Sequence, residues 1–84
     1  MLIYTVPPYG GRVKRDANLK QVGRNIKAAR TRSGLTQQDV EERIGLEYKH
    51  YQRIEAGKID VKVGTLSRLA KLFKTTEEEL VRRR

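Results

Sequence analysis

The sequence predicts an all-α protein, a compact five-helix bundle with an extended N-terminal arm. Three observations support this fold class. Apolar residues recur at steps of three and four along most of the chain, which places them on one face of a helix. The chain has four Tyr, one Phe and no Trp among 84 residues, so Leu, Ile, Val and Ala must supply most of the core. Gly residues stand where the expected helices end, a position that favours Gly because the backbone turns left-handed there.

Composition limits what the protein can do. The net charge is +9, a surplus that attracts polyanions, nucleic acid first and anionic membranes second. The absence of cysteine excludes disulfides and cysteine-rich zinc sites, and the single His cannot make a metal site without carboxylates. No apolar run approaches the roughly 18 residues of a membrane span. We therefore expect no metal, no cofactor, no membrane insertion and a cytoplasmic location.

Residues 1–17 differ from the rest and are expected to form an arm outside the core. Residues 2–6, LIYTV, are rich in β-forming side chains, and the prolines and glycines of residues 7–11 interrupt any regular element. Three arrangements fit this segment: disorder, a strand paired with a partner protein, or an arm lying along DNA.

The first helix is expected to begin near Asn18. Asn is a good N-cap, and Gln21 stands three residues later, which is the spacing of a capping box. Gly34 suits the position just past the last turn. The apolar face of this helix would consist of Leu19, Val22, Ile26 and Ala29.

Two short helices should follow in quick succession. Thr36 is a good N-cap for the second helix, and Gly45 should end it. The third helix is expected from about residue 47 to residue 56, with Gly57 as its stop. Its residues divide between an apolar face and a polar face, and we assign Tyr51 to the core on helical spacing.

The last two helices complete the bundle. A fourth is expected from residue 64 or 65 to residue 73. A fifth should start at Thr76, where Glu79 gives a second capping-box spacing, and should turn Leu80 and Val81 inward. We therefore expect one helix-turn-helix domain over residues 18–81, followed by a basic tail at residues 82–84.

The second and third helices, joined by a short turn that contains Gly, predict a helix-turn-helix motif. A helix of this kind fits the major groove of DNA and presents the side chains of its first turns to base edges.

The segment GLTQQDVEERIGLEYKHYQRIEAGK, residues 34–58, resembles the helix-turn-helix of the lambda and 434 phage repressors, Cro and the xenobiotic-response-element regulators. The shared elements are the Gly-Leu-Thr-Gln opening, the Gly that ends the second helix and the Ile-Glu-x-Gly-Lys close of the third. The resemblance implies a lambda-repressor-like bundle. It also implies sequence-specific binding of double-stranded DNA by a transcriptional regulator of bacterial, plasmid or phage origin.

The resemblance implies roles for eight residues. Gln37 would contact a phosphate and brace the third helix, and Arg30 and Glu55 would form a structural salt bridge. Lys49 and Arg53 would face bases, and both suit guanine because each can donate to O6 and N7. The DNA-contacting set as a whole is Gln37, Tyr48, Lys49, Gln52, Arg53 and Lys58.

The family also implies a homodimer, whose contact commonly involves the C-terminal helix region. Leu80 and Val81 are candidates for that contact, and residues 2–6 could add an exchanged strand.

The sequence departs from the family pattern at two helical positions. Glu47 stands where Ser or Thr usually caps the third helix, so that end should be less well fixed. Tyr51 stands where a small or aliphatic residue is common.

One other function remains open from the sequence. An antitoxin or a coactivator-like protein can use the same fold to hold a partner protein, and the apolar arm would suit such a contact. An enzyme is not expected, because no nucleophile–base pair, metal cluster or glycine-rich phosphate loop is present in the sequence.

Overall fold

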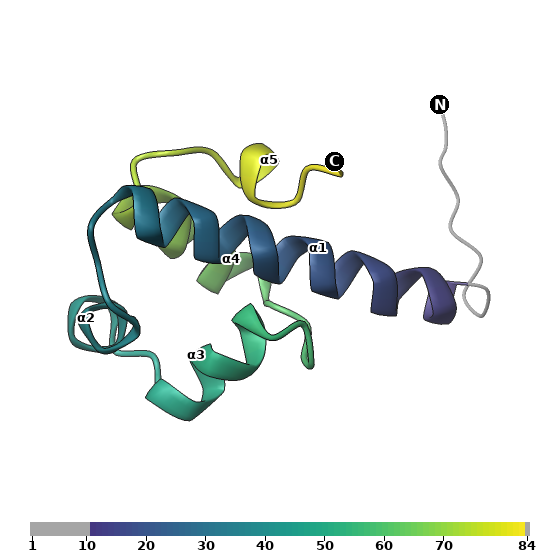
Figure 1. The fold of residues 1–84 in the computed structure, drawn as a ribbon, viewed down its shortest axis with the longest axis horizontal. Coiled ribbons are helices and arrows are strands. Elements are labelled where there is room, and N and C mark those ends of the chain that lie inside the picture. Colours follow the sequence, from purple (N-terminus) through teal and green to yellow (C-terminus); the bar gives the residue numbers. More distant parts are fainter. Residues whose placement is uncertain (1–10, 84) are drawn as a thin grey trace.

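The computed structural model describes the backbone of residues 11–83 and the side chains of residues 18–83. This part of the chain contains five helices and no strand, as predicted for an all-α bundle (Figure 1). In chain order the helices are α1 (Gly11–Arg32), α2 (Gln37–Ile44), α3 (Tyr48–Glu55), α4 (Val63–Leu72) and α5 (Glu77–Leu80).

The core lies between the five helices. Helix α1 packs against α3 and α5, α2 packs against α3 and α4, and α4 packs against α5. Every helix therefore contributes to one shared apolar cluster. Its buried members are Ile26, Ala29, Val40, Tyr51, Ile54, Leu69, Ala70, Phe73 and Leu80.

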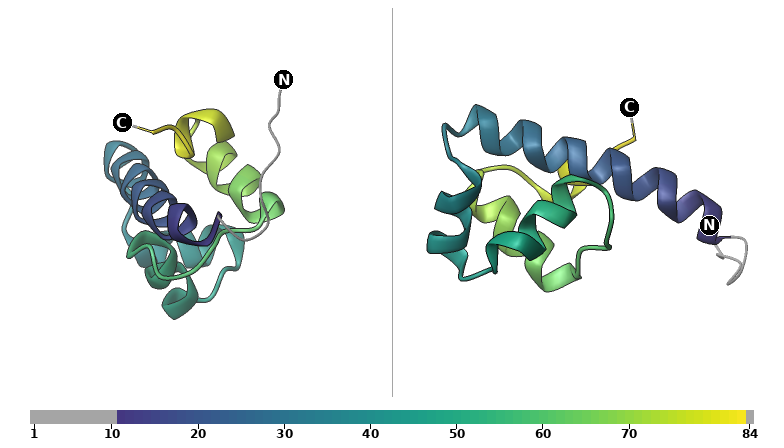
Figure 2. Two further views of the ribbon diagram at one scale, coloured as in Figure 1. Left: turned by 90° about the vertical axis from the view of Figure 1, so that its right-hand side faces the viewer. Right: turned by 60° about the horizontal axis from the view of Figure 1, so that its bottom comes forward.

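Helix α1 begins earlier than the sequence predicted. It starts at Gly11 rather than near Asn18, so the expectation of an extended arm is wrong for residues 11–17. Residues 12–17 contain no Gly or Pro, and once a helix exists each added residue gains a hydrogen bond at little cost. The first turns of α1 extend beyond the rest of the bundle (Figures 1 and 2). The prediction for residues 2–6 lies outside the described residues.

The ends of α2 follow the local chemistry of the sequence. Thr36 Oγ1 accepts a hydrogen bond from the Asp39 backbone N–H at 3.0 Å, and Asp39 Oδ2 accepts one from the Thr36 N–H at 2.8 Å. This reciprocal capping box holds the pKa of Asp39 below its usual range, chiefly through the Thr36 backbone hydrogen bond. At the other end Gly45 has a φ of 72°, in the left-handed region. The predicted bounds of this helix are confirmed.

Helix α3 is fixed at its end and less well fixed at its start. Glu47 makes no side-chain capping bond, as its residue type led us to expect. At the other end the backbone N–H of Lys58 donates to the Arg53 carbonyl at 2.9 Å, and the N–H of Gly57 donates to the Ile54 carbonyl at 3.0 Å. Gly57 has a φ of 73°, so this is a glycine-terminated helix end.

In the C-terminal region, the prediction for Val81 is wrong, and a buried side chain of α1 holds the chain around α5 in place. Leu80 is buried at 1% exposure, but Val81 is 43% exposed and does not point inward. Helix α5 has a single turn that ends at Leu80, so Val81 leaves the helical face. The buried Asn25 side chain holds this region, because its Nδ2 donates to the carbonyls of Leu80 at 3.0 Å and Arg82 at 2.8 Å.

Helix α1 approaches the end of α3 closely at Gly23. A Cβ atom on Gly23 would lie 2.4 Å from the Glu55 carbonyl oxygen and 2.6 Å from that of Ile54. Backbone atoms cannot move aside as a flexible side chain can. The two helices can therefore pack at this distance only because position 23 has no side chain.

We predict that Gly23→Ala destabilises the fold by about 1–3 kcal/mol, the usual cost of forcing an extra carbon into a packed interface. Chemical denaturation followed by circular dichroism measures this change. Gly64→Ala is the matched control, since Gly64 is also helical but a Cβ there meets no atom within 4 Å. If Gly23→Ala were as stable as the wild type, α1 would not pack against the end of α3 at the distance described.

Candidate nucleic-acid interface

Helices α2 and α3 form the helix-turn-helix that the sequence predicted. The turn between them is residues 45–47, and both helices pack against each other under α1 (Figure 1). Helix α3 buries Tyr51, Ile54 and Glu55, which form one side of the helix. Its opposite side is therefore the part of α3 that another molecule can reach.

The exposed side of α3 gathers most of the residues that were expected to contact DNA. Lys49, Gln52, Arg53 and Lys58 are exposed, and Tyr48 is half-buried. A shallow pocket of about 270 Å³ joins four of these side chains on one surface. Its lining is Lys49, Gln52, Arg53, Ala56 and Lys58.

Gln37, the first residue of α2, connects the two helices of the motif. Its Nε2 donates to Glu55 Oε1 at 2.9 Å, and its Oε1 accepts a hydrogen bond from Gln52 Nε2 at 3.4 Å. The same Gln52 nitrogen donates to the Tyr48 hydroxyl at 3.2 Å. A row of hydrogen-bonded polar side chains thus runs from the start of α2 along α3.

A buried ion pair joins α1 to α3. Arg30 Nε donates to Glu55 Oε2 at 2.7 Å and Arg30 Nη2 donates to Glu55 Oε1 at 3.2 Å. The side chains are 13% and 4% exposed, respectively. Arg30 Nη1 also donates to the Leu35 carbonyl at 2.8 Å, so one guanidinium holds α1, the turn before α2 and α3 together.

The surroundings of Glu55 keep it ionised. Burial acts to raise the pKa of this carboxyl, but hydrogen bonds from Arg30 above all, and then from Gln37, leave the pKa below its usual range. Tyr51 is fully buried beside the pair, as its assignment to the core predicted. Burial, and then the neighbouring carboxylate, raise the pKa of the Tyr51 hydroxyl, which therefore stays neutral.

Two side chains that lie beside the motif in the structure carry no distinctive sequence signal. Arg68 on α4 donates to the carbonyl of Ile44 at the end of α2. Lys27 on α1 lines a pocket together with Gln37 and Gln52. The available signal for Lys27 was its place on the polar face of the first helix, seven residues after Lys20.

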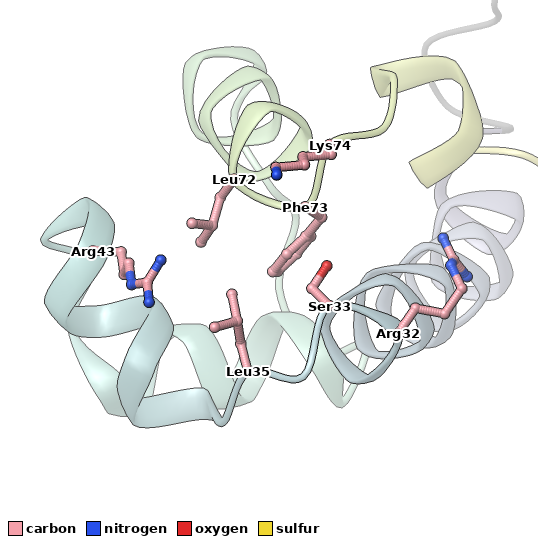
Figure 3. Close-up of a pocket in the computed structure, with 7 residues that line it drawn as sticks. All are labelled: Arg32, Ser33, Leu35, Arg43, Leu72, Phe73 and Lys74. Carbon is pink, nitrogen blue, oxygen red and sulfur yellow. The ribbon is translucent and has the colours of Figure 1, made fainter.

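A separate basic pocket lies on a surface to which α3 contributes no residue. It measures about 520 Å³ and is bounded by the end of α1, by α2 and by the end of α4 (Figure 3). Leu35, Leu72 and Phe73 surround its centre, and Lys74 stands in the left-handed region with a φ of 57°. The full lining is Arg32, Ser33, Leu35, Arg43, Leu72, Phe73 and Lys74.

Comparison with known families agrees with this geometry. Residues 26–80 match the family model described as helix-turn-helix. The chain belongs to this family, of the xenobiotic-response-element and Cro type. Its bundle is accordingly of the lambda-repressor-like type. No curated protein and no solved structure matches the chain.

Family membership indicates the general function of the chain. A domain of this helix-turn-helix type implies DNA binding and is typical of proteins that are not enzymes. Among the helices of residues 11–83, none combines the length and the apolar character that crossing a membrane requires.

We predict that Arg30→Ala lowers the stability of the fold by about 3–5 kcal/mol, because it leaves the buried Glu55 carboxylate without its cation. Thermal unfolding measures this loss. Arg24→Ala is the control, since Arg24 lies on the same helix and is exposed. An unchanged melting temperature for Arg30→Ala would mean that the ion pair does not hold α1 and α3 together.

Proposed function

We propose that the protein binds specific sequences of duplex DNA as a transcriptional regulator of bacterial, plasmid or phage origin, with α3 in the major groove. The observation that carries this proposal is the division of α3 into two sides. Tyr51 and Ile54 are buried on one side, whereas Lys49, Gln52 and Arg53 are exposed on the other. A core-facing side fixes the helix, and an exposed row of hydrogen-bond donors suits base edges.

Each residue of the exposed side has a role that its chemistry supports. Lys49 and Arg53 would donate to O6 and N7 of guanine. Tyr48 and Gln52, which hydrogen-bond to each other, would approach a base or the backbone as a unit. Lys58 would bind a phosphate just past the end of α3. Gln37 would bind a phosphate from the first turn of α2 while its amide stays hydrogen-bonded to α3.

The small size of α3 favours a homodimer. A helix of eight residues spans roughly 12 Å and reads few base pairs. Two copies on half-sites about 34–36 Å apart would supply the remaining specificity. The burial of Leu80 removes it from the candidate contact in this fold, so the contact proposed for the C-terminal region rests on the exposed Val81.

Selection from a pool of randomised duplexes tests the proposal. Bound duplexes are sequenced over several rounds, and the enriched sequence is then titrated against a scrambled one at two salt concentrations. A palindrome with half-sites ten to eleven base pairs apart is the expected result for a dimer. Weak binding that depends steeply on salt, with no enriched sequence, would contradict specific recognition.

We predict that Arg53→Ala weakens binding to the selected duplex by about 1–3 kcal/mol and relaxes the preference at one base position. The loss of a bidentate contact to guanine is the physical reason. Arg32→Ala is the matched control, because Arg32 lines the pocket of Figure 3 and not the α3 surface. Equal losses on the selected and the scrambled duplex would instead make Arg53 a phosphate contact.

The pocket of Figure 3 supports a second candidate function, an antitoxin or coactivator-like module that holds a partner protein. Arg32, Arg43 and Lys74 surround an apolar centre there, an arrangement that suits an acidic segment with a bulky apolar side chain. A selection that enriches no DNA sequence would favour this function over operator binding.

A further inference from the structure

Lys27 joins the surface that we propose for DNA, although it belongs to α1 and not to the helix-turn-helix. Its side chain is exposed and lines a pocket of about 330 Å³. Three helices meet at this pocket, since Gln37 comes from α2 and Gln52 from α3. The full lining is Lys27, Gln37, Gln52, Glu55 and Ala56.

Glu55, the one acidic residue in the lining of this pocket, would repel an anion there only weakly. Both carboxylate oxygens of Glu55 accept hydrogen bonds from Arg30, and Oε1 also accepts one from Gln37. The Glu55 side chain is only 4% exposed. Its charge is therefore balanced by the guanidinium of Arg30. The charge of Lys27 then makes the pocket positive overall.

A second cation of α1 lies at the end of α3. Lys20 stands seven residues before Lys27, which puts it on the same side of the helix and roughly 10 Å away along the axis. A Cβ atom on Gly57 would lie 2.6 Å from Lys20 Cα and 2.8 Å from Lys20 Cγ. Lys20 thus packs against Gly57, the residue before Lys58 in the sequence, and Lys20 is an exposed residue.

We propose that α1 is a second DNA-binding element, in which Lys20 and Lys27 bind backbone phosphates that flank the groove entered by α3. The inference rests on the proposed function and adds two residues to its interface. Such contacts carry no sequence information, because the phosphates are the same at every position. They would strengthen binding to every duplex and add to its salt dependence.

Salt titration of the full chain tests this assignment. Binding of a fluorescent 30-base-pair duplex of random sequence is measured by anisotropy over a series of KCl concentrations. The slope of log K against log salt falls by about 0.9 for each phosphate contact that is lost. We expect the slope for Lys27→Gln to be shallower than the wild-type slope by about 0.9. The slope for the double variant Lys20→Gln/Lys27→Gln should be shallower by about 1.8.

Two further variants separate a phosphate contact from a change of net charge. Lys27→Arg keeps the cation and should keep the wild-type slope. Lys74→Gln removes one charge from the pocket of Figure 3 and should also keep it. Lys27 is exposed, so its variants should melt at the wild-type temperature, which circular dichroism checks for each protein.

The outcomes distinguish this inference from the proposed function. A wild type that binds duplex DNA, with Lys27→Gln giving the same slope, overturns the role of α1 and leaves DNA binding intact. Equal reductions in Lys27→Gln and Lys74→Gln overturn it as well, because they reflect net charge alone. A wild type that shows no salt-dependent binding overturns both proposals. On the selected duplex Lys27→Gln should lose the same factor as on random DNA, and a larger loss there would make Lys27 a base contact.

Discussion

The position of α3 depends on the buried ion pair of Arg30 and Glu55. Two parallel hydrogen bonds fix the distance and the orientation between α1 and α3, and a third bond to Leu35 fixes the turn that leads into α2. A buried pair of this kind is often no more stabilising than apolar residues of the same volume. Apolar residues lack direction, however, whereas the guanidinium of Arg30 makes hydrogen bonds of fixed direction to α3 and to the turn before α2.

Fixing α3 from one side leaves its other side available for recognition. The core-facing residues Tyr51 and Ile54 are buried, and Gly57 closes the end of the helix. The first turn begins at Glu47 without a side-chain cap, so it is held by its packing and by the hydrogen bond between Tyr48 and Gln52. The turn that would approach base edges first thus lacks the stabilisation that a side-chain cap gives.

The sequence was informative where local chemistry decides structure. Thr36 and Gly45 bound α2 as predicted, because a capping side chain and a left-handed glycine act within a few residues. The start of α1 was missed because Asn18 offers a cap that the chain does not use. Lys27 could not be placed beside Gln37 and Gln52, because that neighbourhood depends on how α1 crosses α3.

The ion pair that positions α3 also decides the electrostatics around it. An ionised carboxylate near the surface would repel the phosphates that a major-groove helix must approach, and Glu55 lines the pocket beside Lys27. Arg30 balances this charge from inside the fold, so Lys27 and Lys58 can act outward without first neutralising an acid of their own chain. A neutral residue at position 55 would avoid the repulsion, but it would lose the link to α1. On the proposed binding surface, the pair would therefore serve positioning and attraction together.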